Sequence, residues 1–234
     1  MIPLRDTIRS RSFPIVNWII IGINALIFLF ENTLSPADLE RLFDVFGLVP
    51  NQLSVFQPFS LITIFSSMFL HGGWIHFISN MWILYIFGDN VEDRMGSLRY
   101  LLFYVLSGVT AGVLQGILLQ GPGGNLPTIG ASGAIAGVMG AYIIFFPTSR
   151  IVTLVPVFLF PWIIKVPAII YLGLWFLSQL YSGLFALAMP TGASMGGVAW
   201  WAHIGGFLFG LLLGRVFLRR VPQYYYRDID EYRF

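Results

Sequence analysis

The chain has 234 residues, 57% of them hydrophobic and only 10% charged, and its formal net charge is +2. Soluble domains carry about 25% charged residues, whereas a membrane-spanning helix needs about 20 consecutive, mostly apolar residues. Several such runs occur, so the composition predicts an integral protein of the lipid bilayer, with no nucleic acid partner. The chain has no cysteine, which excludes disulfides, thiolate metal sites and a cysteine nucleophile.

The N-terminal segment, residues 1–13, is basic and precedes an apolar run from Pro14 to Phe30. This run is long for the core of a signal peptide. The sequence then continues as "ENTLSPADLE", which offers no small-x-small cleavage site. We therefore predict a retained first span at about 14–31.

Five further apolar runs bring the prediction to six membrane-spanning helices. They are expected at about 73–91, 98–119, 128–146, 167–189 and 198–218. The predicted fold class is all-α, a six-helix membrane bundle at 14–218. A cytoplasmic segment at 1–13 precedes this domain, and a cytoplasmic tail at 219–234 follows it.

Two apolar segments are not expected to cross the membrane. The first, Ile151 to Ile164, has 14 residues and contains Pro156 and Pro161, so we expect an interfacial or extended hairpin. The second is the later half of the first outer loop, at about 32–72. It is expected to lie in or on the outer leaflet, which makes this loop membrane-associated.

The basic residues predict the orientation of the bundle. If residues 1–13 are inside, only Arg41 of the 13 Lys and Arg residues falls in an outer segment. Because cytoplasmic loops carry the excess of Lys and Arg, both termini are predicted to be cytoplasmic. The expected location is the cell (inner) membrane of a prokaryote, as a multi-pass protein.

Four polar residues are predicted to share one depth in the outer half of the membrane. At about 1.5 Å per residue, Ser132 lies ~6 Å, His203 ~8 Å and Asn80 ~10 Å below the outer ends of their spans, with His76 one turn above Asn80. Polar residues inside a membrane are costly, and each is a functional hypothesis. Each also has a structural alternative, because such side chains often only pack or bond to a neighbouring helix.

Small residues predict that the spans of Ser132 and His203 meet. Small residues at every fourth position let membrane helices approach backbone to backbone. These positions are Ser132, Ala136 and Gly140 in one span and Ala202, Gly206, Gly210 and Gly214 in the other. If the two faces meet, the Ser132 hydroxyl comes against His203.

A serine beside a histidine predicts nucleophilic catalysis. The serine hydroxyl is barely ionised at neutral pH and needs a base, and His203 can take its proton and return it to a leaving amine. Candidate donors to the resulting oxyanion are His76, Asn80 and the Ser132 backbone N–H. No carboxylate is expected at this depth to orient His203, so the sequence predicts a Ser-His dyad without a metal or other cofactor.

These residues lie in motifs that resemble those of the rhomboid family of intramembrane serine proteases. The motifs follow the family's order over about 60–215. GxSG is matched by Gly130, Ala131, Ser132 and Gly133; AHxxGxxxG by Ala202, His203, Gly206 and Gly210; HxxxxHxxxN by His71, His76 and Asn80; and GxxxExxxG by Gly88, Glu92 and Gly96.

The resemblance implies a six-helix core, with a water-filled cavity open to the outer side, that cleaves single-span or other transmembrane proteins. It implies Ser132 as nucleophile and His203 as base, with oxyanion help from His76 and Asn80. The implied supporting residues are His71, Gly130, Gly133 and Gly206. His71 is expected to hold the site together and to contact water there.

The sequence departs from the family pattern at two places. Some relatives carry an aromatic residue four positions after the serine, on which the histidine ring stacks. Here that residue is Ala136, so the ring must be oriented from elsewhere, with Trp200, Trp201 and the second span as candidates. The Trp-Arg pair that some relatives have in the first outer loop is absent.

The alternative function is that of a catalytically inactive rhomboid-like protein that binds membrane clients. Such relatives typically lose the serine or histidine, or place proline beside the serine, whereas this chain has Ser132, His203 and Ala131. A transporter or channel is disfavoured, because no span shows paired carboxylates or a basic stripe. The sequence leaves the oligomeric state open.

Overall fold

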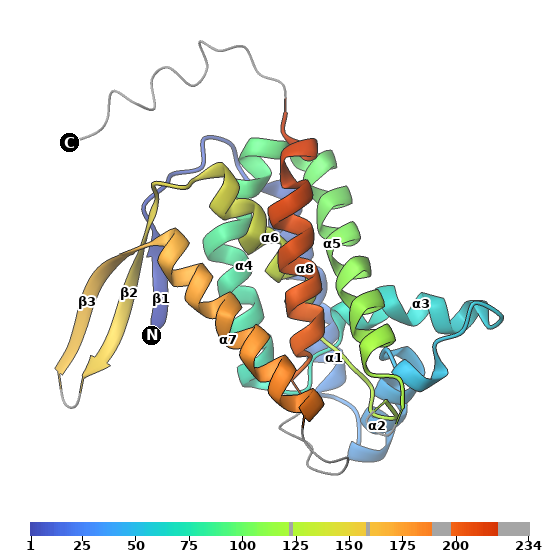
Figure 1. Ribbon diagram of the computed structural model, residues 1–234. Coiled ribbons are helices and arrows are strands. Elements are labelled where there is room, and N and C mark those ends of the chain that lie inside the picture. The colour runs from blue at the N-terminus through green and yellow to red at the C-terminus, as the bar shows by residue number, and fades with distance from the viewer. Residues whose placement is uncertain (122–123, 158–159, 189–197, 220–234) are drawn as a thin grey trace.

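The computed structural model describes residues 1–121, 124–157, 160–188 and 198–219. It is a helical bundle with a small sheet at one edge (Figure 1). The longer helices are α1 (Ile15–Glu31), α2 (Pro36–Phe46), α3 (Pro58–Ser66), α4 (Trp74–Met95), α5 (Ser97–Leu118), α6 (Ser132–Phe145), α7 (Ala168–Ala188) and α8 (Trp200–Leu213). Short 3-10 helices are η1 (Pro50–Gln52), η2 (Ser67–Phe69) and η3 (Gly214–Phe217). From residue 220 on, the predicted tail lies outside the described residues.

Each of the six predicted membrane runs contains a helix. Within the described residues, three helices are long and apolar enough to span a membrane, namely α5, α7 and α8 continued by η3. Helix α3, continued by η2, and helix α4 would form a fourth span if they are counted as one. The chain bends by 81° between them. Helices α1 and α6 are apolar but shorter, with 17 and 14 residues.

One end of the bundle is held by the carboxylate of Glu92, near the end of α4. Its oxygens accept the backbone N–H groups of Val16 and Asn17 at 3.1 and 2.8 Å and the Ser97 hydroxyl at 2.6 Å. The carboxylate therefore satisfies N–H groups in the first turn of α1 that a helix leaves unpaired, and it also binds the start of α5. This is the physical role of the glutamate in the GxxxExxxG motif.

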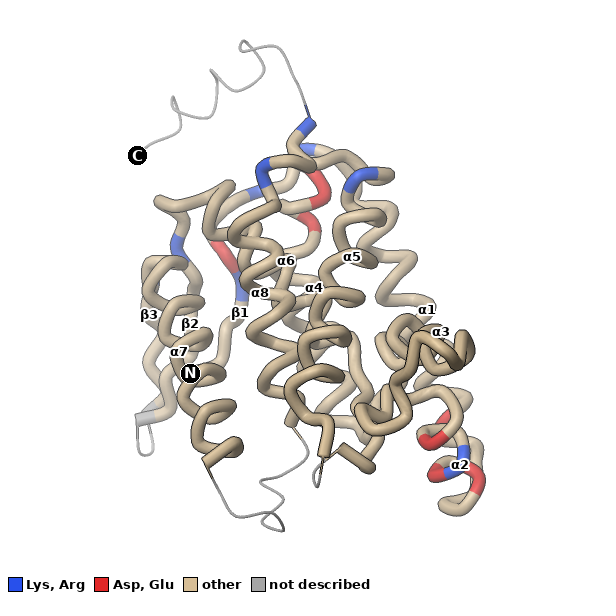
Figure 2. Tube along the Cα trace, turned by 45° about the vertical axis from the view of Figure 1, so that its right-hand side comes forward, with Lys and Arg blue, Asp and Glu red and all other residues tan. Residues whose placement is uncertain are grey.

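The same end of the bundle carries most of the basic residues (Figure 2). Arg99 donates to the Leu218 carbonyl at 2.6 Å, and the Arg219 N–H donates to the Arg94 carbonyl at 3.0 Å. The charged residues of α2 lie at the opposite end. Most of the basic residues that the sequence assigned to one side of the membrane thus lie at one end of the bundle, while the orientation of that end stays a prediction.

The segment between α6 and α7 is a β-hairpin, as predicted. Its strands β2 (Arg150–Val157) and β3 (Phe160–Pro167) pair antiparallel, with Arg150 opposite Pro167. The prediction of an all-α fold was wrong in one respect, because β1 (Ile2–Asp6) pairs with β2 and completes a three-stranded sheet in the order β1-β2-β3.

Strand β1 is also fastened to three helices. The Trp82 indole N–H of α4 donates to the Pro3 carbonyl at 2.7 Å, and the Tyr171 hydroxyl of α7 lies 3.3 Å from the Met1 carbonyl oxygen. Asp6 accepts the Tyr142 hydroxyl of α6 at 2.5 Å. The predicted N-terminal segment 1–13 is therefore partly built into the fold.

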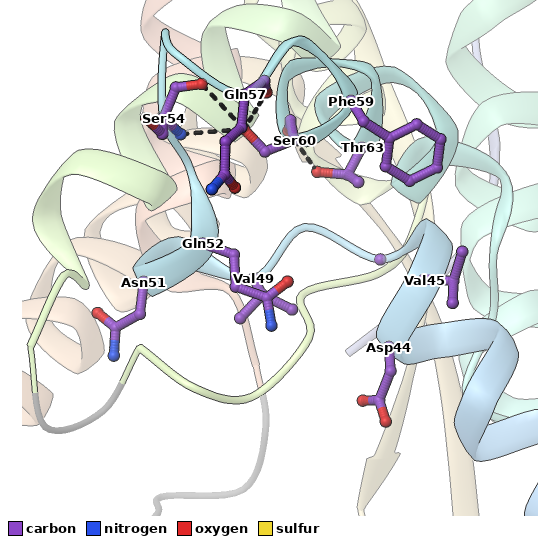
Figure 3. A pocket seen from close by; sticks show the side chains of 11 residues that line it. Asp44, Val45, Val49, Asn51, Gln52, Ser54, Gln57, Phe59, Ser60 and Thr63 are labelled. Atoms are coloured by element: carbon purple, nitrogen blue, oxygen red, sulfur yellow. Dashed lines mark hydrogen bonds between the residues drawn. The ribbon is translucent and has the colours of Figure 1, made fainter.

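The first outer loop folds into α2, η1 and α3. Ser35 caps α2 by accepting the Asp38 N–H at 3.2 Å. Between α2 and α3 lies a pocket (Figure 3), where the Ser60 hydroxyl oxygen accepts the Ser54 N–H at 3.0 Å. No predicted site residue lines this pocket, so it is separate from the chemistry described below.

Candidate active site

The structure brings Ser132 and His203 into contact. Ser132 is the first residue of α6, and His203 lies in the first turn of α8. The Ser132 Oγ and His203 Nε2 atoms are 2.8 Å apart, within hydrogen-bond distance. The serine lies at the N-terminus of its helix, not a turn below it, because α6 begins four residues later than predicted.

The turn before α6 fixes where Ser132 lies. Gly130 has φ +124°, a conformation that only glycine adopts readily, and its N–H donates to the Ser67 carbonyl at 2.8 Å. Thr128 and Leu48 exchange two backbone hydrogen bonds, at 2.8 and 3.0 Å. These backbone hydrogen bonds attach residues 128–130, which precede Ser132, to the first outer loop.

The small residues of α6 and α8 meet, through Gly140 of the predicted stripe and through Gly133 and Gly137 beside it. A methyl group added at Gly206 would overlap the Gly133 carbonyl oxygen, and one added at Gly210 would overlap the Gly137 carbonyl oxygen. The two backbones are therefore in direct contact, as small residues permit. This contact sets the spacing between Ser132 and His203.

A buried glutamine of α5 secures the start of α8. Gln115 is 2% exposed, and its Oε1 accepts the Ala202 N–H at 3.1 Å. The N–H groups of the first helical turn have no partner within the helix, so this bond satisfies one of them beside His203. Gln115 was not among the predicted site residues, although a glutamine inside a membrane run is itself a signal for a specific contact.

The His203 ring is oriented mainly by α7. Its Nδ1 lies 2.7 Å from Gln179 Oε1, and the Trp175 ring centre lies 5.7 Å away, tilted by 37°. Trp200 meets the ring edge-on at 6.4 Å. Trp200 was one of the residues that the sequence suggested for orienting the His203 ring, and it does contact that ring. Gln179 and Trp175 also contact the ring but were not predicted.

His76 and Asn80 lie on α4 beside the turn that precedes Ser132. A methyl group added at Gly130 would be 2.6 Å from His76 Nε2 and 3.8 Å from Asn80 Nδ2. The Gly72 N–H donates to His76 Nδ1 over a long 3.4 Å, which leaves Nε2 as the protonated nitrogen of a neutral ring. Asn80 Nδ2 is buried and has no hydrogen-bond partner within the described residues.

His71 is buried beside His76. It is 1% exposed, and its ring contacts those of Phe28, His76 and Phe77, with centres 6.3, 5.1 and 5.5 Å away. Its backbone N–H donates to the carboxylate of Glu31, which is 2% exposed, at 3.1 and 3.3 Å. The sequence predicted no carboxylate at this depth to orient His203. The carboxylate of Glu31 binds the His71 backbone.

A cavity of about 990 Å³ connects these groups. Side chains of α4, α6, α7 and α8 line it, and these four helices are neighbours in the bundle (Figure 1). They include His76 and Asn80 of α4, Ser132 of α6, Tyr171 and Trp175 of α7, and His203 of α8. The cavity is large enough for a segment of polypeptide or several water molecules, and Ser132 is part of its wall.

No cluster of three or more His, Cys, Asp and Glu side chains suited to a metal ion occurs in the described part of the chain. The polar side chains that line the cavity include the Ser132 hydroxyl, the imidazoles of His76 and His203 and the Asn80 amide. Such a set is suited to acyl transfer by a serine nucleophile, with a histidine base and neutral donors.

The Rhomboid domain family model matches residues 58–220. The chain belongs to the rhomboid family. It is 34% identical to RHOMBOID-like protein 6, mitochondrial, of Arabidopsis thaliana over 170 residues, which is 71% of this chain and 46% of that protein. Against Rhomboid-like protease 5 of Toxoplasma gondii it is 30% identical over 172 residues, or 70% of this chain and 17% of that protein.

A third rhomboid relative is Rhomboid protein 1, mitochondrial, of Saccharomyces cerevisiae, which is 29% identical over 66% of this chain and 41% of its own length. The chain thus spans less than half the length of each of these three relatives. All three are eukaryotic, and two carry mitochondrial names. Rhomboid membership and the apolar helices make the chain a membrane protein, while its prokaryotic origin and its orientation stay predictions.

Proposed function

We propose that this rhomboid is an intramembrane serine endopeptidase that cleaves transmembrane segments of other membrane proteins. The observation that carries the proposal is the 2.8 Å contact between Ser132 Oγ and His203 Nε2 at the wall of a cavity among membrane helices. Family membership supports a protease-type function, and the geometry supplies a nucleophile and a base for it. Ser132 and His203 act as a catalytic dyad without metal or cofactor.

The reaction begins with proton transfer from Ser132 Oγ to His203 Nε2 as the serine oxygen attacks the carbonyl carbon of a peptide bond. The imidazolium then gives this proton to the leaving amine, which leaves an acyl-enzyme ester on Ser132. A water molecule in the cavity next loses a proton to His203 and attacks the ester. Collapse of the second tetrahedral intermediate returns the proton to Ser132.

Three donors face the oxygen on which negative charge develops. They are the Ser132 backbone N–H, Asn80 Nδ2 and His76 Nε2–H. Within the described structure no side chain caps the N-terminus of α6, and Asn80 Nδ2 has no hydrogen-bond partner there, so neither donor is taken up by another side chain. A donor positioned for the transition state and left unpaired in the resting protein is the arrangement that electrostatic catalysis requires.

The proposed topology places six spans across the bilayer, with the basic end of Figure 2 in the cytoplasm. The cavity then faces the outer half of the membrane, and α2 and α3 lie at the outer surface. Substrates are single-span or other transmembrane proteins whose chain enters the cavity near the outer face. The cell (inner) membrane of a prokaryote is the proposed location.

A cleavage assay with a single-span reporter protein tests the proposal. Purified protein in detergent or liposomes is expected to cut the reporter, and Ser132→Ala is expected to bind it without cutting. Equal cleavage by the two proteins would refute Ser132 as nucleophile. Binding without cleavage by the parent would instead favour the client-binding alternative.

A further inference from the structure

We infer that Gln179 is a positioning residue that fixes the tautomer and orientation of His203, which extends the proposed dyad to a Ser132–His203–Gln179 array. The inference rests on the proposed function of the same site. Its observation is the 2.7 Å contact between Gln179 Oε1 and His203 Nδ1, on the side of the ring opposite Ser132.

The tautomer follows from the chemistry of the amide. A glutamine oxygen only accepts hydrogen bonds, so the contact requires His203 Nδ1 to carry the proton. In a neutral ring Nε2 is then unprotonated. That atom lies 2.8 Å from Ser132 Oγ, where it can accept the serine proton. In the other tautomer Nε2 would donate to the serine oxygen and could not act as its base.

The glutamine amide is itself held in one orientation. Its Nε2 donates to the Ser178 hydroxyl oxygen at 3.0 Å and lies 3.4 Å from the Trp175 carbonyl. The Ser178 hydroxyl donates to the same carbonyl at 2.6 Å. Rotating the amide by 180° would set its oxygen toward the Trp175 carbonyl oxygen and its NH₂ group toward His203, so the observed orientation satisfies more hydrogen bonds.

Burial strengthens the assignment. Gln179 is 6% exposed, and a buried amide is costly unless its polar atoms are paired. Here both ends of the amide have partners, one set within α7 and one on α8. Gln179 therefore does for His203 what a carboxylate does in a serine protease triad, but without adding a negative charge.

NMR can measure the tautomer of His203 independently of any effect on the stability of the fold. Because His203 is one of only three histidines, ¹⁵N-histidine NMR of the full chain in detergent can be assigned by comparison with His203→Ala. The Nδ1–H tautomer is expected in the parent. In Gln179→Met, which keeps the length of the side chain but removes the acceptor, the signal is expected to shift toward Nε2–H. A parent ring with its proton on Nε2 would overturn the inference.

Kinetics supply the second readout. In Gln179→Met we expect kcat for the reporter to fall about 10–100-fold, less than the full contribution of a general base, with KM nearly unchanged. Gln179→Glu restores an acceptor and should recover most of that loss. Leu177→Met, a change at an exposed apolar residue two positions away, is the matched control and should behave like the parent.

The outcomes distinguish this inference from the proposed function. If Ser132→Ala abolishes cleavage but Gln179→Met has parental kcat and tautomer, the protease stands and the positioning role fails. The positioning role also fails if Gln179→Glu recovers no activity while its thermal midpoint stays at the parental value. If Ser132→Ala cleaves normally, the proposed function fails, and the NMR result still reports the tautomer of His203.

Discussion

Helix α8 packs on α6 and on α7 in two different ways. Against α6 the contact is between backbones, because glycine carbonyls of α6 lie where side chains at Gly206 and Gly210 would have to be. Against α7 the contact is between rings, with Phe176 stacked on Phe207 at 4.7 Å and Trp175 at 5.9 Å from Phe207. Main-chain atoms therefore set the distance between α8 and α6, whereas large side chains set the distance between α8 and α7.

This difference matches the demands of the proposed chemistry. The backbone contact fixes the nucleophile and the base, which must stay within hydrogen-bond distance of each other. The side-chain contact leaves room for the cavity, which Tyr171 and Trp175 of α7 help to line. The opposite face of α7 is apolar and exposed, at Ile169, Ile170, Leu174, Leu177 and Leu184, as expected of a surface that meets lipid.

The largest effect is expected from breaking the backbone contact. Gly206→Leu should lower the cleavage rate at least ~10²-fold, because a displacement of about 1 Å can cost that much, and overpacking should destabilise the fold by about 1–3 kcal/mol. Gly206→Ala should also be impaired, since even a methyl group overlaps the Gly133 carbonyl oxygen. Cleavage rate and thermal midpoint in detergent are the measurements.

Gly173→Ala is the matched control for this prediction. Gly173 lies in α7, where an added methyl group would meet no atom within 4 Å. The variant should cleave like the parent and be as stable or slightly more stable, because alanine favours a helix over glycine by about 0.5–1 kcal/mol. If Gly206→Leu also cleaved like the parent, the contact between α6 and α8 would not govern the site.

The donors on the cavity wall come next. Losing one oxyanion donor typically lowers kcat by about 10²–10³-fold, so His76→Ala and Asn80→Ala should both be slow, with the smaller loss for Asn80→Ala because other donors remain. Asn80→Ala should leave the thermal midpoint nearly unchanged, since the Asn80 amide nitrogen has no hydrogen-bond partner among the described residues.

Asn17→Ala provides the contrast to Asn80→Ala. The Asn17 side chain accepts the Tyr100 hydroxyl at 2.7 Å and donates to the Leu84 carbonyl at 3.3 Å, and none of these three residues lines the cavity. Its loss should cost about 1–3 kcal/mol of stability, because it leaves a buried partner unsatisfied, with kcat of the folded protein retained. Parental kcat in both His76→Ala and Asn80→Ala would remove the two residues from the mechanism.

The smallest effect is expected at the sheet, because none of its described strand residues lines the cavity. Burial, together with the nearby Asp89 carboxylate, raises the pKa of Asp6 to about 7, although the Tyr142 hydroxyl that it accepts works in the opposite direction. The folded protein then holds a proton that the unfolded chain has lost above about pH 4. Stability is therefore expected to fall as the pH rises from about 4 to 7, and to level off above the folded pKa.

Asp6→Asn should flatten this pH dependence of the thermal midpoint, because asparagine cannot ionise. Asp44→Asn changes an exposed carboxyl of α2 and should leave the dependence in place. The same slope in Asp6→Asn and in the parent would show that another group is responsible.

Much of this arrangement could be predicted from the sequence, because membrane spans and polar residues within them leave strong local signals. The apolar runs predicted where the helices lie, and the two prolines of Ile151 to Ile164 predicted the hairpin. Small residues at intervals of four predicted that α6 and α8 meet. The start of α6 was misplaced because Thr128 and Gly130 form backbone contacts with distant segments, which a local pattern does not contain.

The parts that could not be predicted depend on partners far away in the chain. Strand β1 has only five residues, and its partner strand begins at Arg150. The short N-terminal segment therefore contains no pattern of alternating polar and apolar residues that would predict a strand. Gln115 and Gln179 were visible as amides inside apolar runs, and the rule that such residues seek specific partners would have marked both. Only the packing of the helices shows that one binds the start of α8 and the other binds His203.

Labelling by a fluorophosphonate tests the Ser132–His203 pair most directly, since this probe reacts with activated serines and needs no knowledge of the substrate. Parent, Ser132→Ala and His203→Ala proteins are incubated with it, and the modified peptide is mapped by mass spectrometry. The expected result is a single adduct on Ser132 in the parent and no adduct in either variant. An adduct on another serine, or equal labelling of the parent and Ser132→Ala, would contradict the account.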